Sequence, residues 1–367
     1  MDLGWRSLLL FSLSLPTLCA ALLVATRSAD RPAAFWLAAL FTAWAILTTP
    51  YIIGFAGAYS VYPWLNFAPF NTELWIGPLA YFYVSALVKA PPPRLFWLVP
   101  GISQTLYYIV CFSTMTVAEK TTFNATWHEP YVVPVETLTG LALGVFGLGR
   151  AWVLARNYHT QLEQTHSAAD RFDPGWVRWF AVAMAVCVSA WLLIDLSSLW
   201  LGGISYVDNY WLYLGIGAVF LWLAFEALMR IDWVFPAPQP IDQDSSLGPP
   251  NVRSESLPDA SSIRQTIEQS GWHRDENLTV GKLARLMGTN QAYLSRAINA
   301  GAEENFNRFI NRIRVDEVCQ LLAQSDASLL ELAMDAGFTS KATFNRAFKT
   351  ITGKTPSQWR VAQRLKS

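Results

Sequence analysis

The chain has 367 residues, of which 53% are apolar and only 15% are charged, and its formal net charge is zero. Soluble globular chains carry about 25% charged residues, so this composition excludes an ordinary soluble protein along the whole length. The division is sharp, because residues 1–230 hold long apolar runs with few charges and the chain from Pro236 onward is ordinarily polar. We therefore expect two domains in different surroundings.

Seven stretches of the N-terminal part are apolar enough, and long enough or nearly so, to cross about 30 Å of hydrocarbon as helices. They are Leu8–Ala25, Ala33–Phe55, Asn71–Val88, Leu95–Met115, Tyr131–Leu154, Trp176–Leu201 and Tyr210–Met229. Glu73 and Pro78 make the third the least regular. The first has an alternative reading as a cleaved signal peptide with Arg6 in its n-region. No A-x-A-like cleavage site precedes the second stretch, which favours a retained helix.

Lys and Arg are shared unevenly between alternate connections of this half. Nine lie in or beside the first, third and fifth connections or after the last stretch, namely Arg27, Arg31, Lys89, Arg94, Arg150, Arg156, Arg171, Arg178 and Arg230. The other set holds Arg6 and Lys120. Because basic loops stay in the cytoplasm, the pattern predicts a multi-pass protein with its N-terminus outside and its C-terminus inside.

Two carboxylates fall within the outer part of predicted membrane helices. Glu136 lies in the fifth stretch and Asp195 toward the outer end of the sixth. A charge in lipid costs several kcal/mol unless it is paired or functional. We identify Glu136 and Asp195 as candidate sensing residues for a cationic small molecule or a proton. The alternative is that each is protonated or hydrogen-bonded and only fixes packing.

Residues 235–258 are rich in Pro, Ser, Asp and Gln and show no apolar period, which predicts a disordered linker. The linker separates a membrane domain, residues 1–234, from a C-terminal domain, residues 259–367. The C-terminal domain has 15 Lys and Arg against 11 Asp and Glu. A modest positive excess suits a polyanionic partner.

The segment Leu278–Ala300 predicts a helix, a tight turn and a second helix. Thr279 is placed to cap the first helix, Gly288 to end it in a left-handed conformation, and Asn290 to cap the second. The outward face of the second helix is expected to carry Gln291, Ala292, Ser295 and Arg296. DNA-reading units have this outline.

Ser328–Phe348 repeats the pattern, with Ser328 as cap, Gly337 at the turn, and Thr339 or Ser340 capping the second helix. Its outward face is expected to carry Lys341, Ala342, Asn345, Arg346 and Lys349. Between the two units, Asn305–Ala323 predicts an amphipathic helix about 28 Å long. That length would hold two recognition helices about one DNA turn, near 34 Å, apart.

The run GFTSKATFNRAFK at 337–349, followed by GKTPSQWR at 353–360, resembles the C-terminal signature of the AraC/XylS regulators. The likeness also includes Tyr293–Arg296, Asn305–Phe306, Phe309–Asn311 and Arg314, and it covers about Glu276–Val361. It implies an all-α domain with two helix-turn-helix units that binds promoter DNA and usually activates transcription. More loosely, Gly77–Tyr81 and the basic loops resemble the membrane-embedded members of that family.

The resemblance also implies roles for individual residues. Base-reading positions are Ala292, Ser295, Arg296, Lys341, Ala342, Asn345 and Arg346, to which we add Gln291 on the same face. Lys349, Lys354 and Arg360 are expected to contact phosphates, which position the protein without specifying sequence. The two alanines offer only a methyl group for contact with a thymine methyl. Ile298 stands where many members have Phe.

The sequence therefore predicts an all-α protein, in which a seven-helix transmembrane bundle precedes a soluble domain of two helix-turn-helix units joined by a long helix. We expect a one-component sensor in the bacterial cytoplasmic (inner) membrane that couples an outer or intramembrane signal to sequence-specific promoter binding. RNA polymerase and double-stranded DNA are the expected partners, and homodimerisation is left open. The sequence shows no catalytic motif, cofactor motif or metal-ligand spacing, so neither an enzyme nor a cofactor is expected.

Two alternatives remain at this point. One is a transporter or membrane enzyme that uses Glu136, Asp195 and Glu226, with the C-terminal helix-turn-helix domain as a regulatory appendage. The other keeps the helix-turn-helix fold but uses it to bind a protein partner. Steep salt dependence of DNA affinity distinguishes the leading hypothesis from the second alternative.

Overall fold

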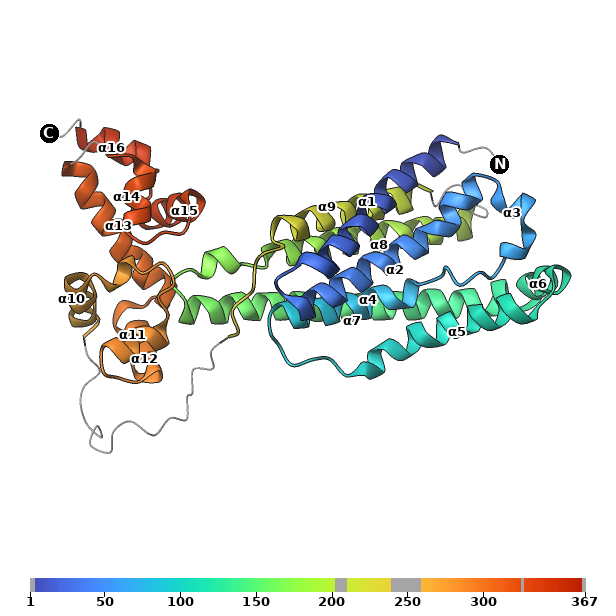
Figure 1. Cartoon of the computed structure of the whole chain (residues 1–367), viewed down its shortest axis with the longest axis horizontal. Helices are drawn as coiled ribbons and strands as arrows, with labels where there is room; N and C mark the ends of the chain where they lie inside the picture. The colour runs from blue at the N-terminus through green and yellow to red at the C-terminus, as the bar shows by residue number, and fades with distance from the viewer. Residues whose placement is uncertain (1–3, 202–209, 239–258, 325–326, 365–367) are drawn as a thin grey trace. The chain divides into compact units, whose positions relative to one another are not determined.

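The computed structural model describes the backbone of residues 4–201, 210–238, 259–324 and 327–364 (Figure 1). Throughout these ranges the regular elements are helices, apart from one isolated antiparallel bridge. The predicted all-α class is therefore confirmed. Most of the predicted linker, residues 239–258, lies outside the described residues.

The chain divides into two compact units. Unit 1 consists of Met1–Arg156 and Pro174–Pro236, and unit 2 consists of Asn157–Asp173 and Ala237–Ser367. A short piece from the middle of the N-terminal half, residues 157–173, thus groups with the C-terminal helices.

The elements of unit 1 follow the apolar pattern of the sequence. They are α1 (Trp5–Arg27), α2 (Arg31–Phe55), α3 (Ala58–Val61), η1 (Pro63–Leu65), α4 (Glu73–Leu87), η2 (Leu95–Leu98), α5 (Val99–Thr114), α6 (Val117–Phe123), the π-helical η3 (Asn124–Val132), most of α7 (Val133–Thr165), α8 (Gly175–Leu201) and α9 (Tyr210–Met229). Each of the seven predicted stretches coincides with one of the long helices. The longest, α7, runs past its apolar part at Leu154 into the polar residues that end at Thr165.

Five helices among the described residues are long and apolar enough to cross a membrane. They are Trp5–Arg27, Arg31–Phe55, Leu95–Thr114, Val117–Thr165 and Tyr210–Met229. The third predicted stretch forms α4, which has only 15 residues. The sixth forms α8, whose side chains from residue 190 onward lie outside the described set.

The long helices of unit 1 lie side by side (Figure 1), and both polar and aromatic side chains join them. The hydroxyls of Ser14 on α1 and Thr48 on α2 are hydrogen-bonded at 2.8 Å in the interior. Trp44 on α2 stacks on Phe220 on α9 with 4.7 Å between ring centroids. Asp30, before α2, pairs with Lys89 after α4 at 2.5 Å.

The helices α4 and α7 approach closely through glycines. A Cβ atom built on Gly147 would lie 2.1 Å from the carbonyl oxygen of Gly77, and one built on Gly77 would lie 2.2 Å from that of Leu143. No side chain fits at either position. Small residues at helix crossings allow the backbone contacts that replace the hydrophobic drive within a bilayer.

Unit 2 combines the end of α7 and η4 (Ala169–Phe172) with a set of shorter C-terminal helices. These are α10 (Ala260–Ser270), η5 (Trp272–Arg274), α11 (Val280–Leu286), α12 (Gln291–Ala302), α13 (Phe306–Gln324), α14 (Leu329–Asp335), α15 (Lys341–Thr352) and α16 (Pro356–Arg364). The helix that the sequence predicts between the two motifs is α13. Its two neighbours on each side form the two predicted helix-turn-helix pairs.

Two separate hydrophobic cores lie along α13. The N-terminal part, from Phe306 to Ile313, packs into a core with α10, α11 and α12. The C-terminal part, through Val315, Val318 and Leu322, packs into a second core with α14 and α15. One helix therefore serves both helix-turn-helix units and fixes the distance between them.

The close contact between Gly147 on α7 and Gly77 on α4 can be tested with two alanine substitutions on α7. Gly147→Ala should lower the free energy of unfolding by about 1–3 kcal/mol, because its new methyl group collides with the backbone of α4. Gly144→Ala is the control on the same helix, since a Cβ there meets nothing within 4 Å. Thermal unfolding of the purified full-length protein in detergent measures both. Equal melting temperatures for the two variants would refute the close crossing.

Candidate DNA-binding interface

The first helix-turn-helix unit is shaped by two capping side chains and one glycine. Thr279 Oγ1 accepts a hydrogen bond from the amide of Lys282 at 3.1 Å, and Asn290 Oδ1 accepts one from the amide of Tyr293 at 2.7 Å. Gly288 between the helices has a φ of +64°, in the left-handed region that glycine adopts without strain. The caps and the turn predicted from the sequence are confirmed.

The second unit repeats this construction. Ser328 caps α14, and Ser340 caps α15 by accepting a hydrogen bond from the amide of Thr343 at 3.2 Å. Gly337 has a φ of +93°, and a Cβ there would lie 2.6 Å from the carbonyl oxygen of Arg274. Both its conformation and its close backbone contact require glycine. Of the two predicted caps for α15, the structure uses Ser340.

The face of α15 agrees with the prediction. Thr343, Phe344, Ala347 and Phe348 are buried in the second core. The outward side chains are Lys341, Ala342, Asn345, Arg346 and Lys349, all of them exposed. A helix that packs on one side and presents cationic and amide groups on the other has the form of a DNA-recognition helix.

The face of α12 differs from the prediction at two positions. Ala292 and Ser295, expected to face outward, are buried with 6% and 5% exposure. Three helices, α10, α11 and α13, contact α12, so less of its surface is exposed than the repeated motif alone predicts. Gln291 is half-buried and Arg296 is exposed, with its Nε donating to the carbonyl of Ala292 at 3.3 Å.

The three predicted phosphate-binding residues fall into two groups. Lys349 at the end of α15 and Lys354 just after it are exposed. Arg360 on α16 is half-buried, and its Nη2 donates to the carbonyl oxygen of Ala327. This guanidinium therefore holds the turn before α14, whereas the two lysines are free to meet a phosphate.

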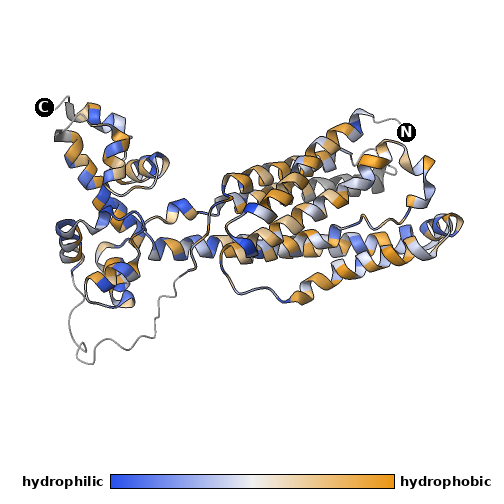
Figure 2. Cartoon of the chain, in the orientation of Figure 1, coloured by the Kyte–Doolittle hydropathy of each residue, from blue (hydrophilic) through white to orange (hydrophobic). Residues whose placement is uncertain are grey.

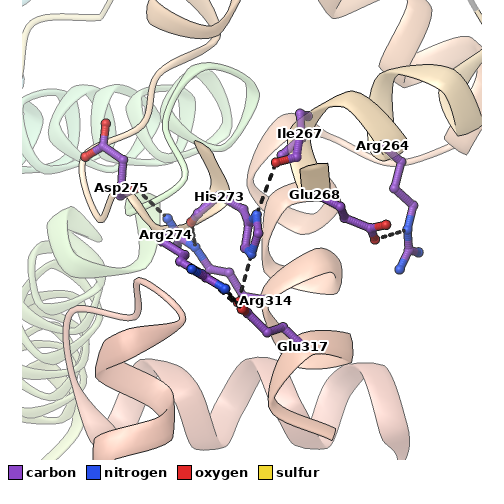
Figure 3. A network of polar contacts seen from close by, with 8 residues as sticks. All are labelled: Arg264, Ile267, Glu268, His273, Arg274, Asp275, Arg314 and Glu317. Atoms are coloured by element: carbon purple, nitrogen blue, oxygen red, sulfur yellow. Dashed lines mark hydrogen bonds and ion pairs between the residues drawn. The ribbon is translucent and has the colours of Figure 1, made fainter. Parts of the chain in front are cut away.

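A buried polar network joins the η5 turn to α13 (Figure 3). The guanidinium of Arg314 is 1% exposed, and it donates to the carbonyl oxygens of His273 at 2.7 Å and Asp275 at 2.8 Å. One turn further along α13, Glu317 Oε2 lies 2.8 Å from the ring Nε2 of His273, and Glu317 Oε1 accepts from Arg274 Nε at 3.0 Å. The network fixes the turn that supports Gly337.

The environment shifts the pKa of two members of the network, Arg314 and Glu317. Burial lowers the pKa of Arg314 to about 10, so the guanidinium stays charged at neutral pH. Burial would raise the pKa of Glu317, but hydrogen bonds from Arg274 and His273 outweigh it and hold that pKa below its ordinary value. The sequence pointed to Arg314 only through the family likeness, and it gave no sign of the pairing between His273 and Glu317.

In unit 1, the predicted sensing residue Glu136 lies in a polar cluster. Its Oε2 accepts hydrogen bonds from the hydroxyl of Tyr108 at 3.1 Å and from Asn71 Nδ2 at 3.2 Å. Beside them, the hydroxyl of Tyr107 lies 2.9 Å from Nδ1 of His128. His128 belongs to the π-helical η3, and π-helical segments often occur at functional sites.

The other predicted sensing residue, Asp195, is in α8, and its side chain lies outside the described residues. The partners of Glu136 come from α5 and from the chain before α4, far away in sequence. No helical period marks such partners, so sequence reasoning missed them. A hydrogen-bonded carboxylate fits both a sensing role and the packing role that the sequence left open.

Comparison with known proteins supports the helix-turn-helix assignment. Residues 283–362 match the family described as Helix-turn-helix domain. A protein of Staphylococcus aureus (strain COL), named an uncharacterized HTH-type transcriptional regulator, is 27% identical over 107 residues, which are 29% of this chain and 14% of that protein. The HTH-type transcriptional regulator CdhR of Pseudomonas aeruginosa is 29% identical over 103 residues, 28% of this chain and 31% of CdhR. The similarity thus spans less than a third of either relative, and no solved structure matches.

The depressed pKa of Glu317 predicts a pH dependence of stability. Its carboxylate stabilises the fold above its unfolded-state pKa, near 4.3, and that contribution is lost as the pH falls through the lower folded value. Glu317→Gln should lower the free energy of unfolding of the full-length protein by about 1–3 kcal/mol at neutral pH. The gap between variant and wild type should narrow as the pH falls below the unfolded-state pKa and through the lower folded-state pKa.

Urea unfolding of the full-length protein in detergent across a pH series measures this gap. Glu268→Gln is the control, because Glu268 makes an exposed ion pair with Arg264 and should matter little. A gap for Glu317→Gln that stays constant down to acid pH would contradict the assignment.

Proposed function

We propose that this chain, whose C-terminal domain is a helix-turn-helix domain of the AraC/XylS type, is a membrane-bound, sequence-specific DNA-binding transcriptional regulator. The observation that carries the proposal is the duplicated helix-turn-helix on a single shared helix, α13, with the exposed cationic face of α15. One chain then reads two successive major-groove segments on one side of a duplex.

The exposed side chains of α15 have the chemistry for reading bases. Arg346 presents paired N–H donors that suit guanine O6 and N7, and the amide of Asn345 suits adenine. Lys341 adds a donor at the start of the helix, and Ala342 meets a thymine methyl. We assign phosphate contact to Lys349 and Lys354, which set the register of the helix without selecting sequence.

In the first unit, the burial of two expected base-reading residues changes which side chains we propose contact DNA. Ala292 and Ser295 expose little surface to a base edge. We therefore place base readout by α12 on Gln291 and Arg296. Since α12 then offers fewer contacts than α15, the second unit should dominate sequence choice.

The surface of unit 1 supports membrane insertion. In Figure 2 much of the helical surface of unit 1 is coloured toward the hydrophobic end of the scale. Many of its large apolar side chains are exposed, for example Leu22 on α1 with 67% exposure and Leu138 on α7 with 67%. Soluble monomeric proteins rarely expose large contiguous apolar patches, so many exposed apolar side chains along these helices favour a lipid environment. Together with the loop charges, this surface supports a place in the bacterial cytoplasmic membrane with the C-terminal domain in the cytoplasm.

We propose that unit 1 senses a small molecule or a proton from the outer side or within the membrane, with the Glu136 cluster as the candidate site. The Glu136 carboxylate accepts hydrogen bonds from two neutral groups, Tyr108 and Asn71. Protonation of the carboxylate, or binding of a cation to it, would change these hydrogen bonds. RNA polymerase is the proposed downstream partner, and a homodimer would double the DNA contacts.

Arg346→Ala tests the proposed function. In full-length protein in lipid nanodiscs, it should weaken binding to a duplex selected by the wild type from a random-sequence pool by about 1–3 kcal/mol. It should also relax the selected sequence near its contact. Lys349→Ala is the matched variant, since loss of a phosphate contact weakens all sequences alike and reduces the salt slope by about one.

Binding titrations over a salt series, with footprints on the selected duplex, measure these effects. Unchanged footprints for both Arg346→Ala and Arg296→Ala would sink the residue assignment. Salt-independent binding by the wild type would sink the proposed function itself.

A further inference from the structure

Residues 157–173, which comprise the last turns of α7 and the connection toward α8, are part of unit 2. We call these residues the docking segment. By the loop charges this connection is cytoplasmic, on the same side as the C-terminal domain. Its inward residues are fully covered, because Leu162 and Ala169 have 0% exposure and Ser167 has 1%. Burial of this degree is typical of a packed interface.

The backbone of the docking segment is anchored at the start of the first helix-turn-helix. The amide of Ser167 donates to the carbonyl oxygen of Leu278 at 3.0 Å, and His166 forms an antiparallel bridge with Thr279, the cap of α11. Asn307 on α13 donates through Nδ2 to the carbonyl oxygen of Ser167 at 2.8 Å. These are specific backbone contacts, which a loose surface loop does not make.

The buried guanidinium of Arg314 completes the anchor. Besides its two carbonyl acceptors, its Nη2 donates to Ser167 Oγ at 3.1 Å. The hydroxyl lies in the interior, so its loss would leave a guanidinium N–H without that acceptor. The docking segment is thus tied into the same network that positions the two helix-turn-helix units.

From this anchor the segment reaches the second recognition helix. Asp170, in η4, forms an ion pair with Arg346 on α15, with 3.2 Å between Oδ1 and Nη1. The side chain of Asp170 is 20% exposed and that of Arg346 is 62% exposed. Burial raises the pKa of the Asp170 carboxyl, and the charges of Arg346 and His159 oppose that rise. The arginine that we assign to base reading is therefore already engaged by a carboxylate of the same chain.

We propose that the docking segment is an intramolecular competitor of DNA, in which the Asp170 carboxylate occupies the Arg346 guanidinium until the membrane unit withdraws it. A carboxylate and the acceptor edge of guanine use the same N–H donors, so the two contacts exclude each other. The competition multiplies the apparent association constant for DNA by the fraction of molecules in which Arg346 is released, so a small released fraction means weak binding. The inference rests on the proposed function.

The helix α7 links this contact to the candidate sensing site. Glu136 lies in the first turn of α7, and the docking segment begins in its last turns before Thr165. A rotation or shift of α7 that follows a change at Glu136 would act directly on the anchor at Ser167. Sequence reasoning missed Asp170 and Ser167, because neither belongs to a recognisable motif.

The test uses full-length protein in nanodiscs and the duplex selected by the wild type. Asp170→Asn should tighten binding by about two- to tenfold, because it removes the competing charge while keeping the shape of the side chain. Asp173→Asn is the control, since it removes one carboxylate charge from the same segment, where Asp173 Oδ1 lies 3.6 Å from Nδ1 of His159. In an Arg346→Ala background, Asp170→Asn should have no effect, because the partner is absent.

The possible results distinguish failure of the proposed competition from failure of the proposed DNA binding. Equal affinity of Asp170→Asn and wild type, weaker binding, or an equal gain in the Arg346→Ala background would overturn the competition while DNA binding stands. A gain for Asp173→Asn as large as that for Asp170→Asn would overturn it too, as a general charge effect. Absence of salt-dependent binding in every variant would overturn the proposed function, and this inference with it.

Discussion

Arg314 places a guanidinium inside unit 2, where a charge is costly unless its N–H groups find acceptors. The acceptors come from the main chain at His273 and Asp275 and from the hydroxyl of Ser167. Satisfying one side chain on α13 therefore requires the η5 turn and the docking segment to take their observed places. A Lys at this position would supply a point charge without the planar set of donors.

This constraint connects the fold to the proposed function. The backbone of the η5 turn lies against Gly337, which forms the turn between α14 and α15. Because α13 contributes to both hydrophobic cores, a single helix connects the two helix-turn-helix units of the proposed DNA reader. The same guanidinium holds the segment that carries Asp170 toward Arg346. Assembly of the reader and its proposed restraint thus depend on one buried group.

Much of this organisation follows from sequence patterns that are local. The helical spans, the caps at Thr279, Asn290 and Ser328, and the outward face of α15 each depend on residues within a few turns of one another. By contrast, Ala292 and Ser295 lie on a helix that α10, α11 and α13 all contact, and α10 is not part of the repeated motif. Likewise, the partners of Glu136 and the pairing of Asp170 with Arg346 join residues far apart in the chain. Periodicity carries no information on such contacts, so they emerge only from the structure.

The central claim is that one membrane-held chain reads two successive major-groove segments through α12 and α15. Hydroxyl-radical and methylation footprinting of full-length protein in nanodiscs on its selected duplex tests this claim most directly. The account predicts two protected major-groove segments about one helical turn apart on the same face of the DNA. Protection of a single segment, or of two segments on opposite faces, would contradict it.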